Sequence, residues 1–161
     1  MKKSLNLLGV VLVSAIIAST SVVSAGNVKF GPEFSKKTSV IVKVIQGEEL
    51  CENPKKSKDS HELWAETTNS FTGTLSGEAE VKAFTKSLKL SLSVSYGKSK
   101  KTTTKHVWTI DPKSVYVCEW GYCNKDVSGT MYTYKEGKIV TKRLRKASYG
   151  VMKYYGGHYV D

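Results

Sequence analysis

The chain is poor in several residue types, and each scarcity argues against a class of protein. Its 161 residues include three cysteines, three histidines and three prolines, and only two of its 25 basic residues are arginine. The cysteines and histidines do not have the spacing of zinc ligands, so we expect no metal and no cofactor. Lysine lacks the bidentate phosphate geometry of arginine, so nucleic acid is not an expected partner. Beyond residue 25, no apolar run approaches the roughly 20 residues that a membrane helix needs.

Catalytic motifs are also missing. The sequence has no nucleophile elbow, phosphate loop, dinucleotide fingerprint or histidine-glutamate zinc motif. Glu78 and Glu80 form a close carboxylate pair, but they stand among lysines and are expected on a solvated face. A triad of Cys51, His106 or His158 and an acid remains as an alternative, because such partners meet only in the fold. We therefore expect a protein that is not an enzyme.

The N-terminus has the pattern of a secretory signal. Lys2 and Lys3 precede a largely apolar run over residues 7–18, and small residues surround Ala25. This pattern predicts cleavage after residue 25, which leaves one β-rich domain over residues 26–161 and a secreted, extracellular protein. The alternative is an uncleaved N-terminal anchor. No cysteine stands at the cleavage point, which argues against a lipoprotein.

The charge of the chain is strongly positive. The formal net charge is +11, and removal of the signal takes away two lysines and no acid, which leaves +9. A surface of this kind is attracted to anionic polymers and headgroups, so an anionic membrane or cell-wall surface is the expected partner. The alternative is that the lysines keep an extracellular β protein soluble and protect its strand edges.

The cysteines of an exported chain are candidates for cross-linking. Cys118 and Cys123 enclose four residues, a spacing at which two strands can meet across a tight turn. We predict a disulfide between them. The alternatives are that the pair stays reduced, or that Cys51 bonds to one of them.

The clearest periodicity lies over residues 87–96. Apolar residues alternate there with serines and Lys89, which predicts a strand with one apolar face, made up of Leu88, Leu90, Leu92, Val94 and Tyr96. Residues 79–83 continue the alternation on the opposite parity, so a bulge or turn is needed near Phe84-Thr85. A short helix over residues 78–86 is the alternative, because Ala, Glu and Lys favour helix.

Further strands are predicted on both sides of this segment. The β-branched run 40–45 is the expected first strand, followed by a polar surface loop over 47–61 that holds Cys51. Strands are also expected to start near Val107, to run over 115–120 with a return through the cysteine loop, and to occupy 127–134 and 147–155. The expected fold is therefore all-β: a single-domain antiparallel sandwich, barrel or long twisted meander.

The last thirty residues mix tyrosines with basic residues. Such a mixture is typical of polysaccharide-binding faces and membrane interfaces, although aromatic residues also simply favour strands. The surface-binding candidates in this region are Lys142, Arg143, Arg145, Lys146, Tyr149, Tyr154 and Tyr155.

Residues 67–110 resemble a known module. The runs 67–74, 87–97 and 98–104 are rich in serine and threonine, and they resemble the Ser/Thr-rich module of aerolysin-type β-pore-forming toxins. The resemblance implies a segment that is folded away in the soluble protein and refolds into a membrane hairpin after assembly of a homo-oligomer. Its membrane-insertion candidates are the five apolar residues of 88–96 named above. Lys89 has the parity of the serines and would face water.

These observations lead to one functional expectation. We expect a secreted, cationic, non-enzymatic β protein that acts at a cell envelope, with a membrane-active, toxin-like or antimicrobial role. The alternative is a soluble extracellular binding module or inhibitor that recognises a wall polymer or a protein partner.

Overall fold

The structure is a computed structural model that describes residues 28–160, so the predicted signal peptide lies outside the described residues. No helix within that range is both long enough and apolar enough to cross a membrane. The secondary structure elements, in chain order, are β1 (Gly31–Asn53), β2 (Asp59–Gly73), α1 (Gly77–Ser87), β3 (Lys98–Ile110), β4 (Ser114–Lys135) and β5 (Lys138–Tyr159).

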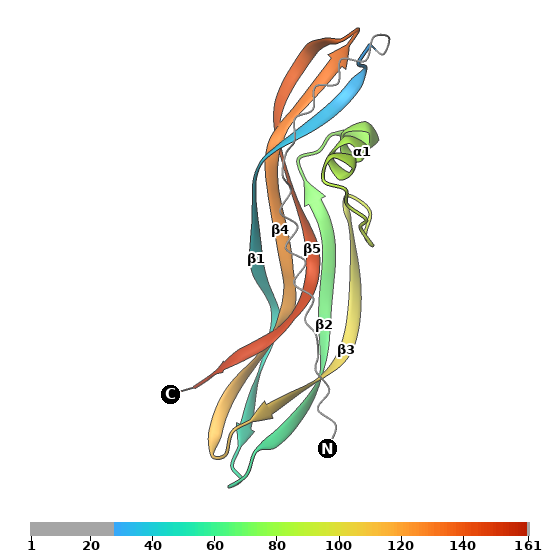
Figure 1. The fold of residues 1–161 in the computed structure, drawn as a ribbon. Helices are drawn as coiled ribbons and strands as arrows, with labels where there is room; N and C mark the ends of the chain where they lie inside the picture. Colours follow the sequence, from blue (N-terminus) through green and yellow to red (C-terminus); the bar gives the residue numbers. More distant parts are fainter. Residues whose placement is uncertain (1–27, 161) are drawn as a thin grey trace, which may run out of the picture.

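The five strands form one antiparallel sheet with the order β1-β4-β5-β2-β3. The long strands run along the length of an elongated molecule (Figure 1). The sheet is not closed, because β1 and β3 are edge strands. The prediction of an all-β single domain is confirmed, in the form of an open twisted sheet.

The sheet has a weak seam between β5 and β2. These strands pair only where Phe71–Gly73 meets Ala147–Tyr149, whereas β2 pairs with β3 from Asp59 to Phe71. The seam divides the sheet into one part with β1, β4 and β5 and another with β2 and β3. Side chains of both parts form one hydrophobic cluster, here called the lower core, of Cys51, Ala65, Trp108, Ile110 and Cys118. The indole N–H of Trp108 donates to the Gly156 carbonyl at 2.9 Å, and that of Trp120 donates to the Glu66 carbonyl at 3.1 Å. Indole donors thus tie the two parts together.

The predicted strand over residues 87–96 is wrong in secondary structure and right in the direction of its side chains. The chain forms α1 up to Ser87 and then an irregular stretch that belongs to no strand. Val94 is buried, the other apolar members of the alternating set are half-buried, and the serines and Lys89 between them are exposed. A period of two therefore indicated which side faces the core, while the helix alternative was correct for the preceding residues.

The predicted loop over 47–61 is also wrong. β1 continues to Asn53 and pairs with β4 up to Ser114, so Cys51 lies in a strand and is buried. The Asn53 amide donates to the carbonyls of Ser57, Ile110 and Asp111, which holds a short connection of residues 54–58 against the β3–β4 turn.

The predicted disulfide between Cys118 and Cys123 is contradicted. Both residues lie in the continuous strand β4, and no bond joins them. Five residues of extended chain separate their Cα atoms by about 16 Å, far beyond the 4.4–6.8 Å of a disulfide. Because five is odd, their side chains also point to opposite faces of the sheet.

Candidate membrane-insertion site

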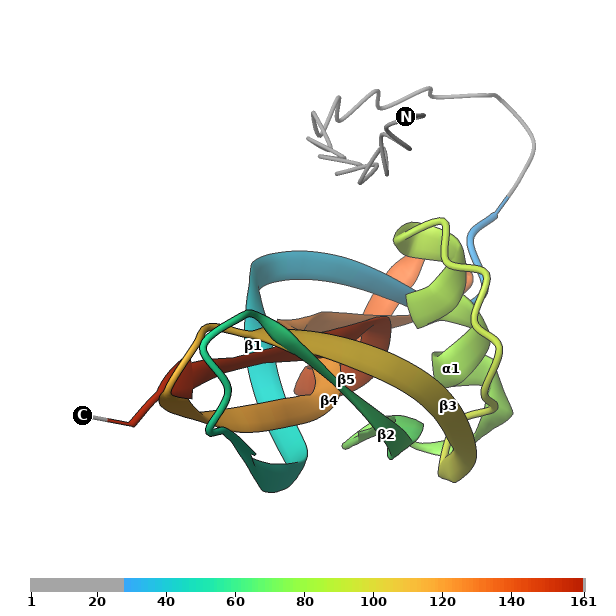
Figure 2. The same ribbon diagram turned by 90° about the horizontal axis from the view of Figure 1, so that it is seen from below.

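Residues 74–97, here called the docked segment, connect β2 to β3. The segment consists of α1 and the irregular stretch that follows it, and it lies beside the sheet at the ends of these two strands (Figures 1 and 2). All five membrane-insertion candidates fall in its second half. Since β2 and β3 are paired up to Phe71 and Lys98, both ends of the docked segment emerge side by side.

Local sequence explains why α1 forms. Glu78 and Glu80 stand in its first turn and Lys86 in its last, an arrangement that complements the helix dipole. At its C-terminus the Leu90 amide donates to the Thr85 carbonyl and the Lys89 amide to the Lys86 carbonyl, which is a Schellman cap. Lys89 occupies the left-handed position of this cap with φ 52°, a position that favours glycine.

The apolar side of the docked segment packs on a second hydrophobic cluster, here called the upper core, which includes Phe34, Phe71 and Phe84. Phe84 is fully buried, with its ring centroid 4.8 Å from that of Phe34 and 6.0 Å from that of Phe71. Tyr96 meets Phe71 edge-on at 5.1 Å. Leu75, Val81, Ala83, Leu88, Leu90 and Leu92 pack on the same cluster. The docked segment thus covers apolar surface that the sheet cannot cover alone.

The main chain of the stretch that follows α1 has few hydrogen-bond partners. Among the described residues, 91–94 make no hydrogen bond from main chain to main chain. Its specific polar contact is the Asn69 amide, which donates to the Ser93 hydroxyl at 3.3 Å. This stretch is therefore held mainly by its side chains.

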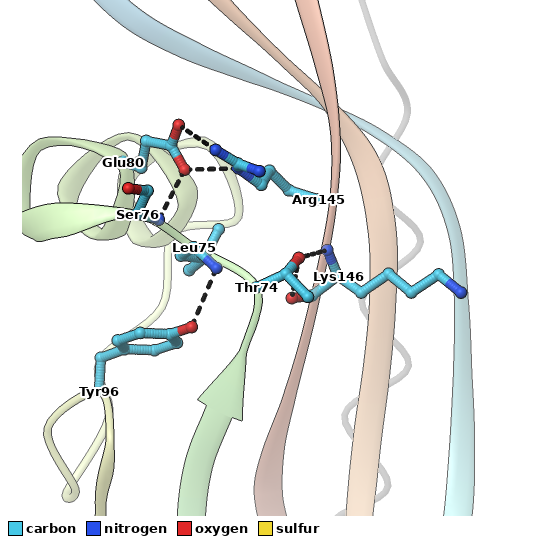
Figure 3. A network of polar contacts seen from close by, with 7 residues as sticks. All are labelled: Thr74, Leu75, Ser76, Glu80, Tyr96, Arg145 and Lys146. Carbon is cyan, nitrogen blue, oxygen red and sulfur yellow. Dashed lines mark hydrogen bonds and ion pairs between the residues drawn. The ribbon is translucent and has the colours of Figure 1, made fainter.

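Polar contacts hold the first half of the docked segment to β5 (Figure 3). The Thr74 amide donates to the Lys146 carbonyl at 2.8 Å, and the Lys146 amide donates to the Thr74 hydroxyl at 2.9 Å. The Leu75 amide donates to the Tyr96 hydroxyl at 2.9 Å, which links the two halves of the segment.

The strongest of these contacts is an ion pair between Arg145 and Glu80. Arg145 Nε and Nη2 donate to the two carboxylate oxygens of Glu80 at 2.7 and 3.0 Å, and the Ser76 amide donates to the same carboxylate at 2.8 Å. The two side chains are only 14% and 12% exposed. Bidentate, charge-assisted bonds of this kind are roughly twice as strong as neutral ones. We call these three groups the clasp.

The clasp shifts the pKa values of both of its charged side chains. Burial raises the pKa of the Glu80 carboxyl, but hydrogen bonds from Arg145 and the Ser76 amide outweigh burial and hold that pKa below its usual value. The hydrogen bond to Glu80 in turn raises the pKa of the Arg145 guanidinium. The expectation of a solvated face therefore holds for Glu78, whose side chain is 79% exposed, and is wrong for Glu80.

The surface-binding candidates on β5 separate into two groups. Lys142, Arg143 and Lys146 are exposed. Arg145 belongs to the clasp, Tyr149 is a core residue at 5% exposure, and Tyr155 stacks on His106 with ring centroids 4.2 Å apart. Tyr154 is half-buried, and its hydroxyl lies 3.2 Å from Lys43 Nζ. The aromatic and ion-pair partners of Arg145, Tyr149, Tyr154 and Tyr155 come from elements distant in the chain, so composition alone did not separate these residues from the exposed ones.

Sequence reasoning missed the contributions of Phe34 and Phe84 to this site. The only sequence signal for the burial of Phe84 is a large aromatic side chain that stands among small and charged residues. For the residues that the structure describes, no group of three or more His, Cys, Asp or Glu side chains is placed to hold a metal ion.

Comparisons with known proteins give one weak likeness. No protein-family model and no curated protein matches the sequence. Among solved structures, the chain is similar to the parasporin-2 Bacillus thuringiensis toxin that recognizes cancer cells, with a TM-score of 0.29 and 12% identity over 82% of this chain and 72% of that chain. This is a weak resemblance to a toxin.

Proposed function

We propose that this protein is membrane-active, and that it acts by releasing the docked segment and inserting it as a β-hairpin that continues β2 and β3. The observation that carries the proposal is the register of these two strands. Their last pairs are Ser70 with Ser99 and Phe71 with Lys98. If that register simply continues, the two halves of the docked segment pair throughout.

The continued register sorts the side chains by polarity. Leu75 then lies opposite Val94, Ala79 opposite Leu90 and Val81 opposite Leu88, and the two-residue turn falls at Phe84-Thr85. Directly opposite residues share a face of a hairpin. One face is therefore apolar over the span from Leu75 to Val94, except for Lys86 beside the turn.

The opposite face is polar over the same span. It carries Thr74, Ser76, Glu78, Glu80 and Lys82 on the first arm and Ser87, Lys89, Ser91, Ser93 and Ser95 on the second. Glu80 lies opposite Lys89, so the charges on this face are partly paired. A turn of two residues also explains why the apolar parity changes near Phe84, because opposite positions of such a hairpin differ in parity.

The length of the hairpin fits a bilayer. Residues 74–83 and 86–95 supply about ten residues on each arm, and a tilted membrane strand needs about 9–11. Lys86 is the one charge with apolar parity, and it lies next to the turn, where a long side chain can reach water. At the base, Tyr96 and Lys98 have the amphipathic character that suits a membrane interface.

The docked form is suited to release. Insertion would provide strand partners for the main chain of residues 91–94, which has none in the docked form. The exposed Lys142, Arg143 and Lys146 of β5 contribute to a basic surface that attracts anionic lipid. The contacts that oppose release are the Phe84 core and the clasp.

A pair of engineered disulfides tests the proposal. Asn69→Cys with Ser93→Cys joins two side chains that touch in the docked form. In the hairpin, Ser93 would face Ser76, about 23 Å along the strand from residue 69. The matched control is Asn69→Cys with Lys100→Cys, a pair that is opposite in the existing register and stays so in the hairpin. Both are made with Cys123→Ala.

We expect the first pair, once oxidised, to abolish dye release from anionic vesicles and to regain it on reduction. The control pair should release dye in both states. Release by the first pair in its verified, oxidised form would contradict insertion of this segment. A wild type that releases no dye but sediments with purified cell wall would support the soluble binding module instead.

A second cross-link tests the register itself. Ser76→Cys with Ser93→Cys should oxidise to a disulfide in the vesicle-bound protein, because these residues are opposite in the continued register. Ser76→Cys with Leu92→Cys places the second thiol on the other face and serves as the control. Equal cross-linking of both pairs would refute the register.

A further inference from the structure

Cys51 and Cys118 come together in the lower core. Cys51 lies near the end of β1 and Cys118 in β4, and their Sγ atoms are 2.7 Å apart although 67 positions separate them in the chain. Their residues are 2% and 0% exposed. The two sulfur atoms are therefore in direct contact.

The strand register accounts for the meeting. Cys118 pairs with Glu49, and Cys51 pairs with Tyr116, so the two cysteines stand two positions apart on neighbouring strands. A shift of two positions keeps side chains on the same face of a sheet. Cys123 has the opposite parity to Cys118 and lies outside this pair.

Other roles for the two sulfurs fit the surroundings less well. Metal binding needs further ligands, and in the described part of the chain no suitable group of side chains exists. Burial, reinforced by Cys51, raises the pKa of the Cys118 thiol well above its usual value. A buried thiol of this kind is a poor nucleophile, so a catalytic cysteine is disfavoured.

We propose that Cys51 and Cys118 form a disulfide bond in the exported protein. Two S–H bonds break and one S–S bond forms, and the two hydrogens are passed to the disulfide of a thiol oxidoreductase or of a small-molecule oxidant, which becomes two thiols. The bond forms during folding, before the core closes over the sulfurs. The expected export of the chain supplies the oxidising compartment.

This bond would lie at the base of the part of the chain that contains the docked segment. Residues 52–117 contain β2, the docked segment and β3, so the disulfide would join β1 to β4 at the base of the whole excursion. It leaves the tip free, and it does not depend on membrane insertion. It stabilises the lower core whichever function the protein has.

Thiol counting on the secreted protein tests the inference. The protein is unfolded without reductant, alkylated and mapped by mass. We expect one alkylated residue, Cys123, and a cross-linked pair of peptides that contain Cys51 and Cys118. The Cys123→Ala control should then show no alkylation, and Cys51→Ala should free Cys118 as a second reactive thiol.

Three alkylated cysteines in the wild type would overturn the proposal, as would a bond from Cys123 to either of the others. The result does not require any variant to fold, because the wild-type map decides it alone. Dye release plays no part in this readout, so a failure here is separate from a failure of the proposed function.

Discussion

Replacing Glu80 by glutamine should loosen the clasp without removing its shape. Glutamine keeps one carbonyl oxygen for the Ser76 amide or for Arg145, but it loses the charge that both donors share. Arg145 then stays largely buried without a counterion. The docked form should become less stable relative to the released form, while strands β1 to β5 keep their pairing.

The size of the effect follows from the geometry. Hydrogen bonds to charged groups contribute about 1.5–3 kcal/mol each, and losing one partner of a fully buried pair costs about 3–5 kcal/mol. The clasp is 12–14% exposed and glutamine retains part of its bonding, so we take about 2 kcal/mol. That corresponds to about a 30-fold increase in the released population.

Hydrogen exchange of the α1 amides measures this population directly, and the initial rate of dye release from anionic vesicles measures its consequence. Glu78→Gln is the matched control, because Glu78 is in the same helical turn and contacts only Lys82 on an exposed surface. We expect Glu80→Gln to increase both rates by about one to two orders of magnitude, and Glu78→Gln to leave them close to wild type.

Two outcomes would refute this reasoning. If Glu80→Gln and Glu78→Gln behave alike, the clasp does not hold the docked segment. If Glu80→Gln accelerates exchange but not dye release, then release of the segment does not limit the rate of membrane action. Opening of the clasp would then not be the step that starts insertion.

Two further predictions concern the same segment. Because the pKa of Glu80 is lowered, the clasp contributes its full stability above the usual carboxyl value of 4.5 and loses it as the pH falls through the lowered pKa. In a pH series of α1 amide exchange, measured relative to intrinsic exchange, release should therefore rise only below the usual carboxyl value of 4.5, and an increase at pH 6 would count against the clasp. Lys89→Gly should relieve the left-handed position at the helix end, stabilise the docked form by about 0.5–1 kcal/mol and slow dye release several-fold. An unchanged or lower Tm in calorimetry would show that this cap does not limit docking.

Sequence patterns predicted part of this site and not its secondary structure. The alternation over 88–96 identified which side chains face the core, because apolar side chains are buried in an irregular stretch as well as in a strand, while the polar ones between them stay in water. It did not show that the stretch lacks a strand partner. Pairing depends on the neighbouring strand, and here the preceding residues form α1 and carry the chain away from the edge of β2.

The cysteines illustrate the same limit. A spacing of four residues between Cys118 and Cys123 suits a turn, but β4 continues through both of them because its main chain is paired on each side by β1 and β5. The meeting of Cys51 and Cys118 required the β1–β4 register, which no local pattern contains.

By itself the sequence determined an all-β domain and the inward and outward sides of its extended segments, since these depend on residue type and short-range alternation. The tertiary structure alone decided where strands end, which cysteines meet, and that Glu80 faces Arg145, 65 positions away. These features arise from contacts between elements that are distant in the chain, and the sequence of one element does not specify which element packs beside it.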